Sequence, residues 1–208
     1  MEGTGPDRAV ARVAGGPPGF TLIEILLVAA ILATLAAIGL PHYSRVIEAY
    51  RAHAAARYLA GRFALARLEA VRRSACVGLR FDGNGPSAGW ATYVDGNANG
   101  IRSRDIAMGV DPLLRPTERL GDLFPGVVFG LHPSVPEIGA RTPAAGERDP
   151  IRIGSSQIMT FTPIGTATSG TVYLHGRGVT QFAVRVLGVT GRTRVMRFDP
   201  GAGEWIAK

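Results

Sequence analysis

A single carboxylate, Glu24, interrupts an apolar stretch near the beginning of the 208-residue chain. Residues 20–40 comprise 21 positions, and 17 of them are Ala, Val, Ile, Leu or Phe. A charge at the centre of a membrane helix costs about 2.5–3.5 kcal/mol and costs less near the end of the helix. Glu24 lies near one end of the run and still needs a partner, so the chemistry it offers is an ion pair in apolar surroundings.

Two arginines, Arg192 and Arg194, lie one residue apart in the sequence GRTR at residues 191–194. In a strand, such a pair points to the same side of the sheet. Guanidinium groups keep their charge and bind phosphate through two hydrogen bonds. The formal net charge of +7 also favours an anionic partner such as nucleic acid, lipid headgroups or surface sugars. The alternatives are an arginine-rich composition without a partner and a solvated hairpin edge that resists aggregation.

The sequence DGNANG at residues 95–100 imitates the beginning of a calcium-binding loop. The twelfth position of such a loop needs a bidentate acid, but here it is Ile106, and Asp105 lies one residue too early. Asn, Asp and Gly also favour tight turns, which is the simpler interpretation. With Cys76 as the only cysteine and four scattered histidines, the sequence predicts no metal site and no cofactor. It also lacks the common hydrolase and nucleotide-binding motifs, so we expect no enzymatic activity.

Residues 20–40 would form a helix about 30 Å long, which matches the hydrocarbon core of a bilayer. No small-residue cleavage site follows the run, and the run is long for a signal peptide, so we predict a retained membrane helix over residues 20–43. An amphipathic helix is predicted to continue over residues 44–75. Its apolar positions recur at near-helical spacing and are Ile47, Tyr50, Ala54, Tyr58, Leu65 and Leu68.

The remaining residues, 76–208, predict a β-rich head. Short runs of Val, Ile, Phe, Tyr and Thr alternate with Gly, Pro and Asn, a pattern typical of antiparallel sheets. The predicted strands cover residues 76–81, 90–94, 127–131, 157–162, 171–174, 179–187 and 192–198. Four prolines make residues 131–150 a long loop, which is either a contact or mobile segment or a disordered one. The predicted fold class is α+β, with the long N-terminal helix packed on an antiparallel head.

The sequence GFTLIE at residues 19–24, followed by the apolar run, resembles the N-terminus of type IV pilins and type II secretion pseudopilins. The resemblance implies that a prepilin peptidase cuts between Gly19 and Phe20 and methylates the new amine of Phe20. Residues 1–19 would then be a cleaved leader. This leader is longer than many in the class, so the true start codon stays open. The resemblance also implies that Glu24 pairs with the amine of a neighbouring subunit and so sets the stagger between subunits.

Four further segments resemble the GspH/FimT branch of minor pseudopilins and minor pilins: ALARLEAVRR at 64–73, GWATYVDGNANG at 89–100, FTPIGTATSGTVYL at 161–174 and GRTRV at 191–195. The resemblance implies a β-sandwich-like head in the periplasm and a single-pass anchor in inner-membrane lipid. It also implies as partners the prepilin peptidase, other pseudopilins or minor pilins, and secreted cargo.

From this resemblance we expect a structural minor pseudopilin. It would join the tip or initiation complex of a type II secretion pseudopilus or a type IV pilus-like filament. The alternative is a minor pilin that binds DNA in natural transformation through Arg192 and Arg194. The sequence does not separate secretion from pilus machinery, and it does not identify the partner subunits or the cargo.

Overall fold

The computed structural model describes residues 19–83, 87–144, 146, 148–176 and 180–208, without the side chains of residues 38–45. The chain divides into two compact units, Met1–Tyr43 and Ser44–Lys208, and each is considered by itself. The predicted leader, apart from Gly19, lies outside the described residues.

One helix, α1, extends over Leu22–Arg73 and has 52 residues. It runs without a break through both predicted helical segments, beginning two residues later than predicted and ending two residues earlier. Ala and Leu, the strongest helix formers, dominate its sequence. Arg72 and Arg73 lie in its last turn, where positive charge complements the helix dipole. Within the described part of the chain, no helix combines the length and the apolar character needed to cross a membrane.

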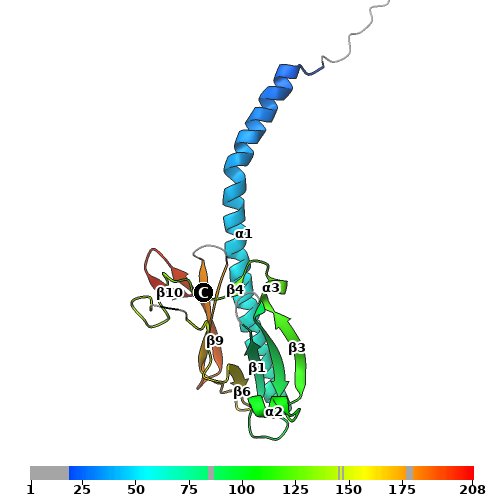
Figure 1. Ribbon diagram of the computed structural model, residues 1–208, viewed down its shortest axis with the longest axis vertical. Coiled ribbons are helices and arrows are strands. Elements are labelled where there is room, and N and C mark those ends of the chain that lie inside the picture. The colour runs from blue at the N-terminus through cyan, green and yellow to red at the C-terminus, as the bar shows by residue number, and fades with distance from the viewer. Residues whose placement is uncertain (1–18, 84–86, 145, 147, 177–179) are drawn as a thin grey trace, which may run out of the picture. The chain divides into compact units, whose positions relative to one another are not determined.

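The described residues of the head, within residues 44–208, form two antiparallel sheets (Figure 1). The first has the strand order β3-β2-β1-β6. Its strands are β1 (Val77–Asp82), β2 (Gly89–Val94), β3 (Leu113–Arg119) and β6 (Ile158–Phe161). Two short helices, α2 (Ser103–Ala107) and α3 (Leu120–Leu123), flank β3 along the chain.

The second sheet has the order β10-β9-β8-β7-β4, and β5 also pairs with β7. Its strands are β4 (Val128–Phe129), β5 (Ile151–Arg152), β7 (Gly170–His175), β8 (Gln181–Leu187), β9 (Arg192–Asp199) and β10 (Glu204–Ala207). The predicted α+β class with an antiparallel head is thereby confirmed.

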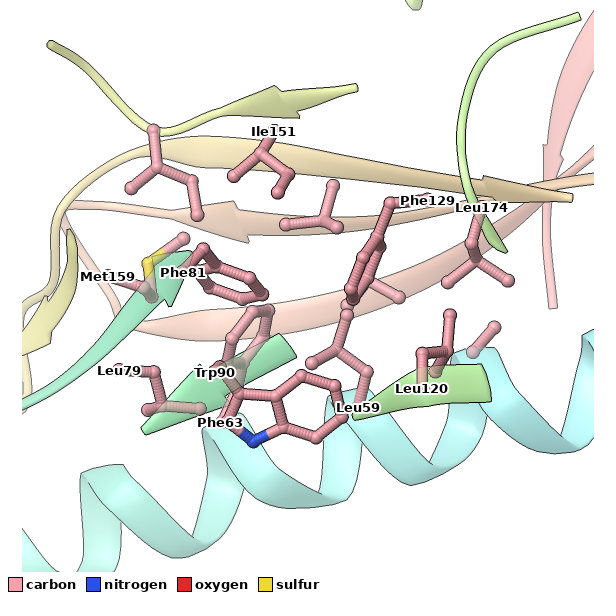
Figure 2. Close-up of a cluster of buried hydrophobic side chains, with 14 of the residues drawn as sticks. Leu59, Phe63, Leu79, Phe81, Trp90, Leu120, Phe129, Ile151, Met159 and Leu174 are labelled. Carbon is pink, nitrogen blue, oxygen red and sulfur yellow. The ribbon is translucent and has the colours of Figure 1, made fainter. Parts of the chain in front are cut away.

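The core of the head is aromatic and lies where α1 meets both sheets (Figure 2). The ring of Phe63, from α1, lies 6.2 Å from that of Phe81 and 6.1 Å from that of Phe161. Phe129, from the second sheet, contacts Phe81 and Trp90 of the first at 5.9 and 6.1 Å. These contacts join the helix and the two sheets into one hydrophobic cluster, and burial of such large rings dominates core energetics.

The predicted apolar face of the amphipathic helix was partly wrong. Tyr50 and Leu68 are 73% and 63% exposed. Five of the seven buried residues on the face that packs on the sheets are alanines, and the seven are Ala52, Ala55, Ala56, Leu59, Phe63, Ala66 and Ala70. The prediction rested on the large apolar residues and therefore missed this face. Alanine contributes little hydrophobicity, but it allows close approach between helix and sheet.

A polar contact also joins α1 to the outer strand β3. The carboxylate of Glu118 accepts hydrogen bonds from the Tyr58 hydroxyl at 2.7 Å and from Arg62 Nε at 2.9 Å. Arg62 also makes an ion pair with Glu118 at 2.7 Å, and its guanidinium lies 5.0 Å from the centre of the Tyr58 ring. Burial of the Tyr58 hydroxyl and its bond to Glu118 raise the pKa of Tyr58.

All seven predicted strands have a counterpart, although Val179 in one of them lies outside the described residues. Strand β3 was missed because Pro116 interrupts its sequence, and a proline argues against a central strand. β3 is at an edge of its sheet, where a proline is tolerated. β5 and β10 are too short, at two and four residues, to leave a clear pattern.

The predicted loop at 131–150 contains no helix or strand among its described residues. It is nevertheless held in place. The Trp205 indole donates to the carbonyl oxygen of Pro136 at 2.9 Å, and the Ile138 amide donates to the Tyr173 hydroxyl at 3.0 Å. Arg148 donates to two carbonyl oxygens of the same loop at 2.7 and 2.8 Å. The described part of this loop is therefore a packed contact segment.

Candidate functional site

The beginning of α1 holds the residues that the sequence singled out. The Glu24 amide donates to Thr21 Oγ1 at 3.3 Å and to the Thr21 carbonyl oxygen at 3.1 Å. Thr21 therefore caps the helix by satisfying an amide that has no partner in the first turn. Residues 21–24 also match the capping-box signature T-x-x-E, a local signal from which this helix start can be predicted.

Phe20 and Glu24 lie on the same side of the helix start. They line a shallow recess of about 350 Å³ together with Ile25, Val28 and Leu32. Among the described residues the Glu24 carboxylate forms no ion pair. The neighbouring apolar side chains, including Phe20 at 78%, are largely exposed within the unit. This segment thus presents a carboxylate without an ion-pair partner among the described residues, beside an exposed apolar surface.

The second candidate, Arg192 and Arg194, lies on β9, which pairs with β8. Both arginines are exposed. Arg194 lies directly opposite Arg185, and Arg192 lies opposite Leu187. Val184 and Val186 of β8 belong to the core, so Arg185 and its partner point to the other side of the sheet. The structure thus places three exposed guanidinium groups on one face.

Arg197 does not belong to this group. It lies opposite Phe182, whose side chain is buried in the core, so it occupies the inner face of β9. Its Nε atom is buried and has no hydrogen-bond partner among the described residues. Arg197 is close to the pair in sequence, but the period of two along the strand places it on the opposite face of the sheet.

Gly191 is required by the turn that precedes the arginine pair. Its φ angle is +59°, in the left-handed region that favours glycine. A Cβ atom at this position would lie 2.4 Å from the carbonyl oxygen of Gly165 and 3.0 Å from Arg67 Nε. The glycine therefore lets two turns touch, while Arg67 Nε donates to the Gly165 carbonyl oxygen at 3.2 Å.

The loop that imitates a calcium site is held by its own amides. The Asp95 carboxylate accepts from the amides of Asn97 and Gly100 at 3.1 and 2.7 Å. Asp111, which the motif does not include, accepts from the amides of Gly96 and Arg102 at 3.2 and 3.1 Å. Within the described residues, no three His, Cys, Asp or Glu side chains are placed to hold a metal ion. These contacts agree with the interpretation as a structural turn.

Cys76 lies beside this loop. Burial of the thiol raises its pKa, and the negative charges of Asp95 and Asp111 raise it further. A raised pKa leaves less of the reactive thiolate at neutral pH, so Cys76 is a poorly nucleophilic thiol.

Comparison with known proteins shows which family this chain is similar to. The model of the type II transport protein GspH family matches residues 55–194, which cover α1 from Ala55 and most of the head. A pilin-like protein, PilA1, from Thermus thermophilus is 44% identical over 81 residues. That match covers 39% of this chain and 50% of the relative, so it spans about half of the relative's length. No solved structure matches significantly. The family match covers more than half of the chain, and the protein therefore belongs to the GspH family of pilin-like proteins.

Proposed function

We propose that this chain is a structural minor pseudopilin that joins the tip or initiation complex of a secretion pseudopilus or pilus-like filament. The observation that carries the proposal is the arrangement of Phe20 and Glu24. The Glu24 carboxylate, which has no ion-pair partner among the described residues, lies in the first turn of a helix whose neighbouring side chains are apolar and exposed. Such a carboxylate is tolerated in an apolar assembly only when it meets a cation. The amine that cleavage would create at Phe20 of a neighbouring subunit is such a cation.

In this proposal the segment at residues 20–43 anchors the protein in inner-membrane lipid, and the head lies in the periplasm. The head contacts other minor subunits or cargo, and the protein is a substrate of the prepilin peptidase rather than an enzyme. The family membership supports the filament role. The exposed apolar side chains around Glu24 support the anchor, because an isolated helix in water would gain from covering them.

Processing by the peptidase is tested directly. After co-expression with a prepilin peptidase, mass spectrometry should find a mature chain that begins with N-methylated Phe20. Gly19→Leu should block the cut, because a bulky side chain would occupy the position next to the scissile bond. Gly16→Leu, three residues earlier in the leader, is the matched control and should be processed normally. A cut elsewhere, or a Gly19→Leu protein that is still processed, would contradict the proposal.

The exposed arginines favour a second candidate function, a DNA receptor. Arg192, Arg194 and Arg185 share one face of the β8–β9 hairpin, and none of them makes an ion pair with another described residue. Three guanidinium groups on neighbouring positions of a sheet suit the repeated phosphates of a nucleic-acid backbone. Such binding would be insensitive to sequence and strongly dependent on salt.

We expect Arg192→Ala/Arg194→Ala to weaken the binding of DNA by the detergent-solubilised full chain. Because each phosphate contact contributes about 0.9 to the salt slope, the slope of log affinity against log salt should fall by about 2. Fluorescence anisotropy with a labelled duplex at several salt concentrations measures both quantities. Arg115→Ala/Arg119→Ala, on strand β3 of the other sheet, is the matched control. If both double variants bind DNA with equal affinity, the DNA-receptor proposal is wrong and the arginine pair is a solvated strand surface.

A further inference from the structure

One end of the head gathers several turns that are distant in sequence. Val77 begins β1 directly after α1 and pairs with Val94 of β2 and Phe161 of β6, so the turns that follow those two strands lie at this end. Ala167 bridges to Phe161, and its amide donates to the Gly188 carbonyl oxygen at 2.8 Å, which adds the β8–β9 turn. Figure 1 shows α2 at this end of the head. We name residues 67–76, 95–112, 162–168 and 188–192 the turn end.

In the turn end, most of the negatively charged side chains are buried and the positively charged ones are exposed. Three of its four carboxylates are buried: Asp95, Asp105 and Asp111 are 9%, 7% and 1% exposed. The fourth, Glu69, makes ion pairs with Arg72 and Arg73. The arginines of the turn end are all exposed, and they are Arg67, Arg72, Arg73, Arg102, Arg104 and Arg192. The surface of the turn end is therefore strongly cationic.

The same end exposes aliphatic side chains at the tips of two turns. Ile164 is 85% exposed and Val189 is 88% exposed. Neither turn is loose. The hydroxyl groups of Thr162 and Thr166 lie 2.7 Å apart across the first turn, and the Gly165 amide donates to the Thr162 carbonyl oxygen at 3.0 Å. The two turns also contact each other. Arg67 donates to the Gly165 carbonyl oxygen of the first turn, and Gly191 of the second turn packs closely against the same oxygen.

We propose that the turn end docks on an anionic lipid surface, with Ile164 and Val189 entering the boundary of the acyl chains. Charge complementarity carries the choice of partner: the exposed arginines face outward, and the acids that would repel lipid phosphates are buried. The aliphatic side chains occupy separate turn tips with Arg67 between the two turns, an arrangement that a fluid surface accommodates more readily than a rigid protein surface. Interfacial binding of this kind combines apolar insertion with attraction to anionic headgroups.

The test uses the full chain reconstituted in phosphatidylcholine vesicles, with heads on the outside. It therefore rests on the proposed anchor, which flotation of the chain with these vesicles checks first. Fluorescent vesicles of phosphatidylcholine and phosphatidylglycerol are then added, and energy transfer between the two vesicle populations measures tethering by the head. Failure of flotation would count against the anchor, whereas flotation without tethering would count against the docking surface.

Two double variants separate the two contributions. Arg102→Gln/Arg104→Gln should weaken tethering about twenty-five-fold, because each cation near an anionic surface contributes about five-fold. Ile164→Ser/Val189→Ser should weaken it about ten-fold or more by removing the inserted aliphatic groups. Arg119→Gln/Arg141→Gln and Ile206→Ser are the matched controls, because these exposed side chains belong to none of the segments of the turn end. Tethering by them should equal that of the wild type.

The wild type should tether vesicles that contain phosphatidylglycerol and should not tether pure phosphatidylcholine vesicles. Equal tethering of both would overturn the proposal, as would full tethering by the Ile164→Ser/Val189→Ser variant. Aggregation of the protein-bearing vesicles before the second population is added would show that a second copy of the chain occupies the surface. That result would also overturn the lipid assignment.

Discussion

Replacing Glu24 by alanine should sharply reduce incorporation into filaments, while membrane insertion and peptidase cleavage continue. The substitution removes the carboxylate that would meet the Phe20 amine of a neighbouring subunit, and it leaves that amine without a partner in an apolar interface. Removing one member of a buried, hydrogen-bonded charge pair costs about 2–5 kcal/mol, which corresponds to a loss of about thirty-fold or more in association. Co-expression with the other subunits, followed by shearing and quantitation of the filament fraction, measures the effect.

Two further variants define what Glu24 contributes. Glu24→Gln keeps the size and a hydrogen-bond acceptor but removes the charge, so its incorporation should fall between that of the wild type and that of Glu24→Ala. Glu48→Ala removes a carboxylate from the same helix within the head unit and should assemble normally. If Glu24→Ala were incorporated into filaments as efficiently as the wild type, Glu24 would not form the proposed ion pair.

Replacing Phe63 by alanine should destabilise the head by about 3–5 kcal/mol, a large share of the 5–15 kcal/mol typical of a folded domain. Phe63 is 0% exposed, and its ring contacts Phe81 and Phe161. The substitution would leave a cavity where α1 meets the first sheet. For a chain of this size the Tm should fall by roughly 10 °C. Tryptophan fluorescence during heating of the solubilised full chain reports this loss, because Trp90 lies in the same core.

Leu68→Ala is the matched control for Phe63→Ala. Leu68 belongs to the same helix and is 63% exposed, so its loss should change the free energy of unfolding by about 0.5 kcal/mol or less. This comparison also tests the helix face directly, because the large residues of the sequence pattern would assign Leu68 to the buried side. A larger loss of stability in Leu68→Ala than in Phe63→Ala would show that the alanine-lined face is not the one packed on the sheets.

The sequence predicted the fold class and seven strands because those elements carry local signals, such as β-branched residues bounded by Gly and Pro. It did not predict β3, where Pro116 suggested an interruption, since edge position is decided by the order of strands in space. The buried face of α1 was assigned in part to Tyr50 and Leu68 for a related reason. Which side of a helix is covered depends on the sheet that it meets, and alanine gives a weak hydrophobic signal.

The candidate sites divide in the same way. The motif around Gly19, Phe20 and Glu24 is contiguous in sequence, so it could be recognised without a structure. That Arg192 and Arg194 point to the same side could be predicted from the period of a strand. That Arg194 lies opposite Arg185 could not, because it depends on the register between β8 and β9. Asp111 was not predicted to hold the loop at residues 95–100, because ten residues separate it from Gly100 and no local pattern connects them.

In the proposed filament, Pro116 also bears on how the head of this chain lies beside the heads of other subunits. The first sheet ends at β3, and an uncovered strand edge can pair with the edge of another molecule and begin aggregation. A proline there removes one amide from the edge and interrupts the row of donors that a foreign strand would need. At the edge of the second sheet, β10 offers only four residues for such pairing. The two sheet edges formed by β3 and β10 are thus poor templates, which allows heads to be close neighbours without fusing their sheets.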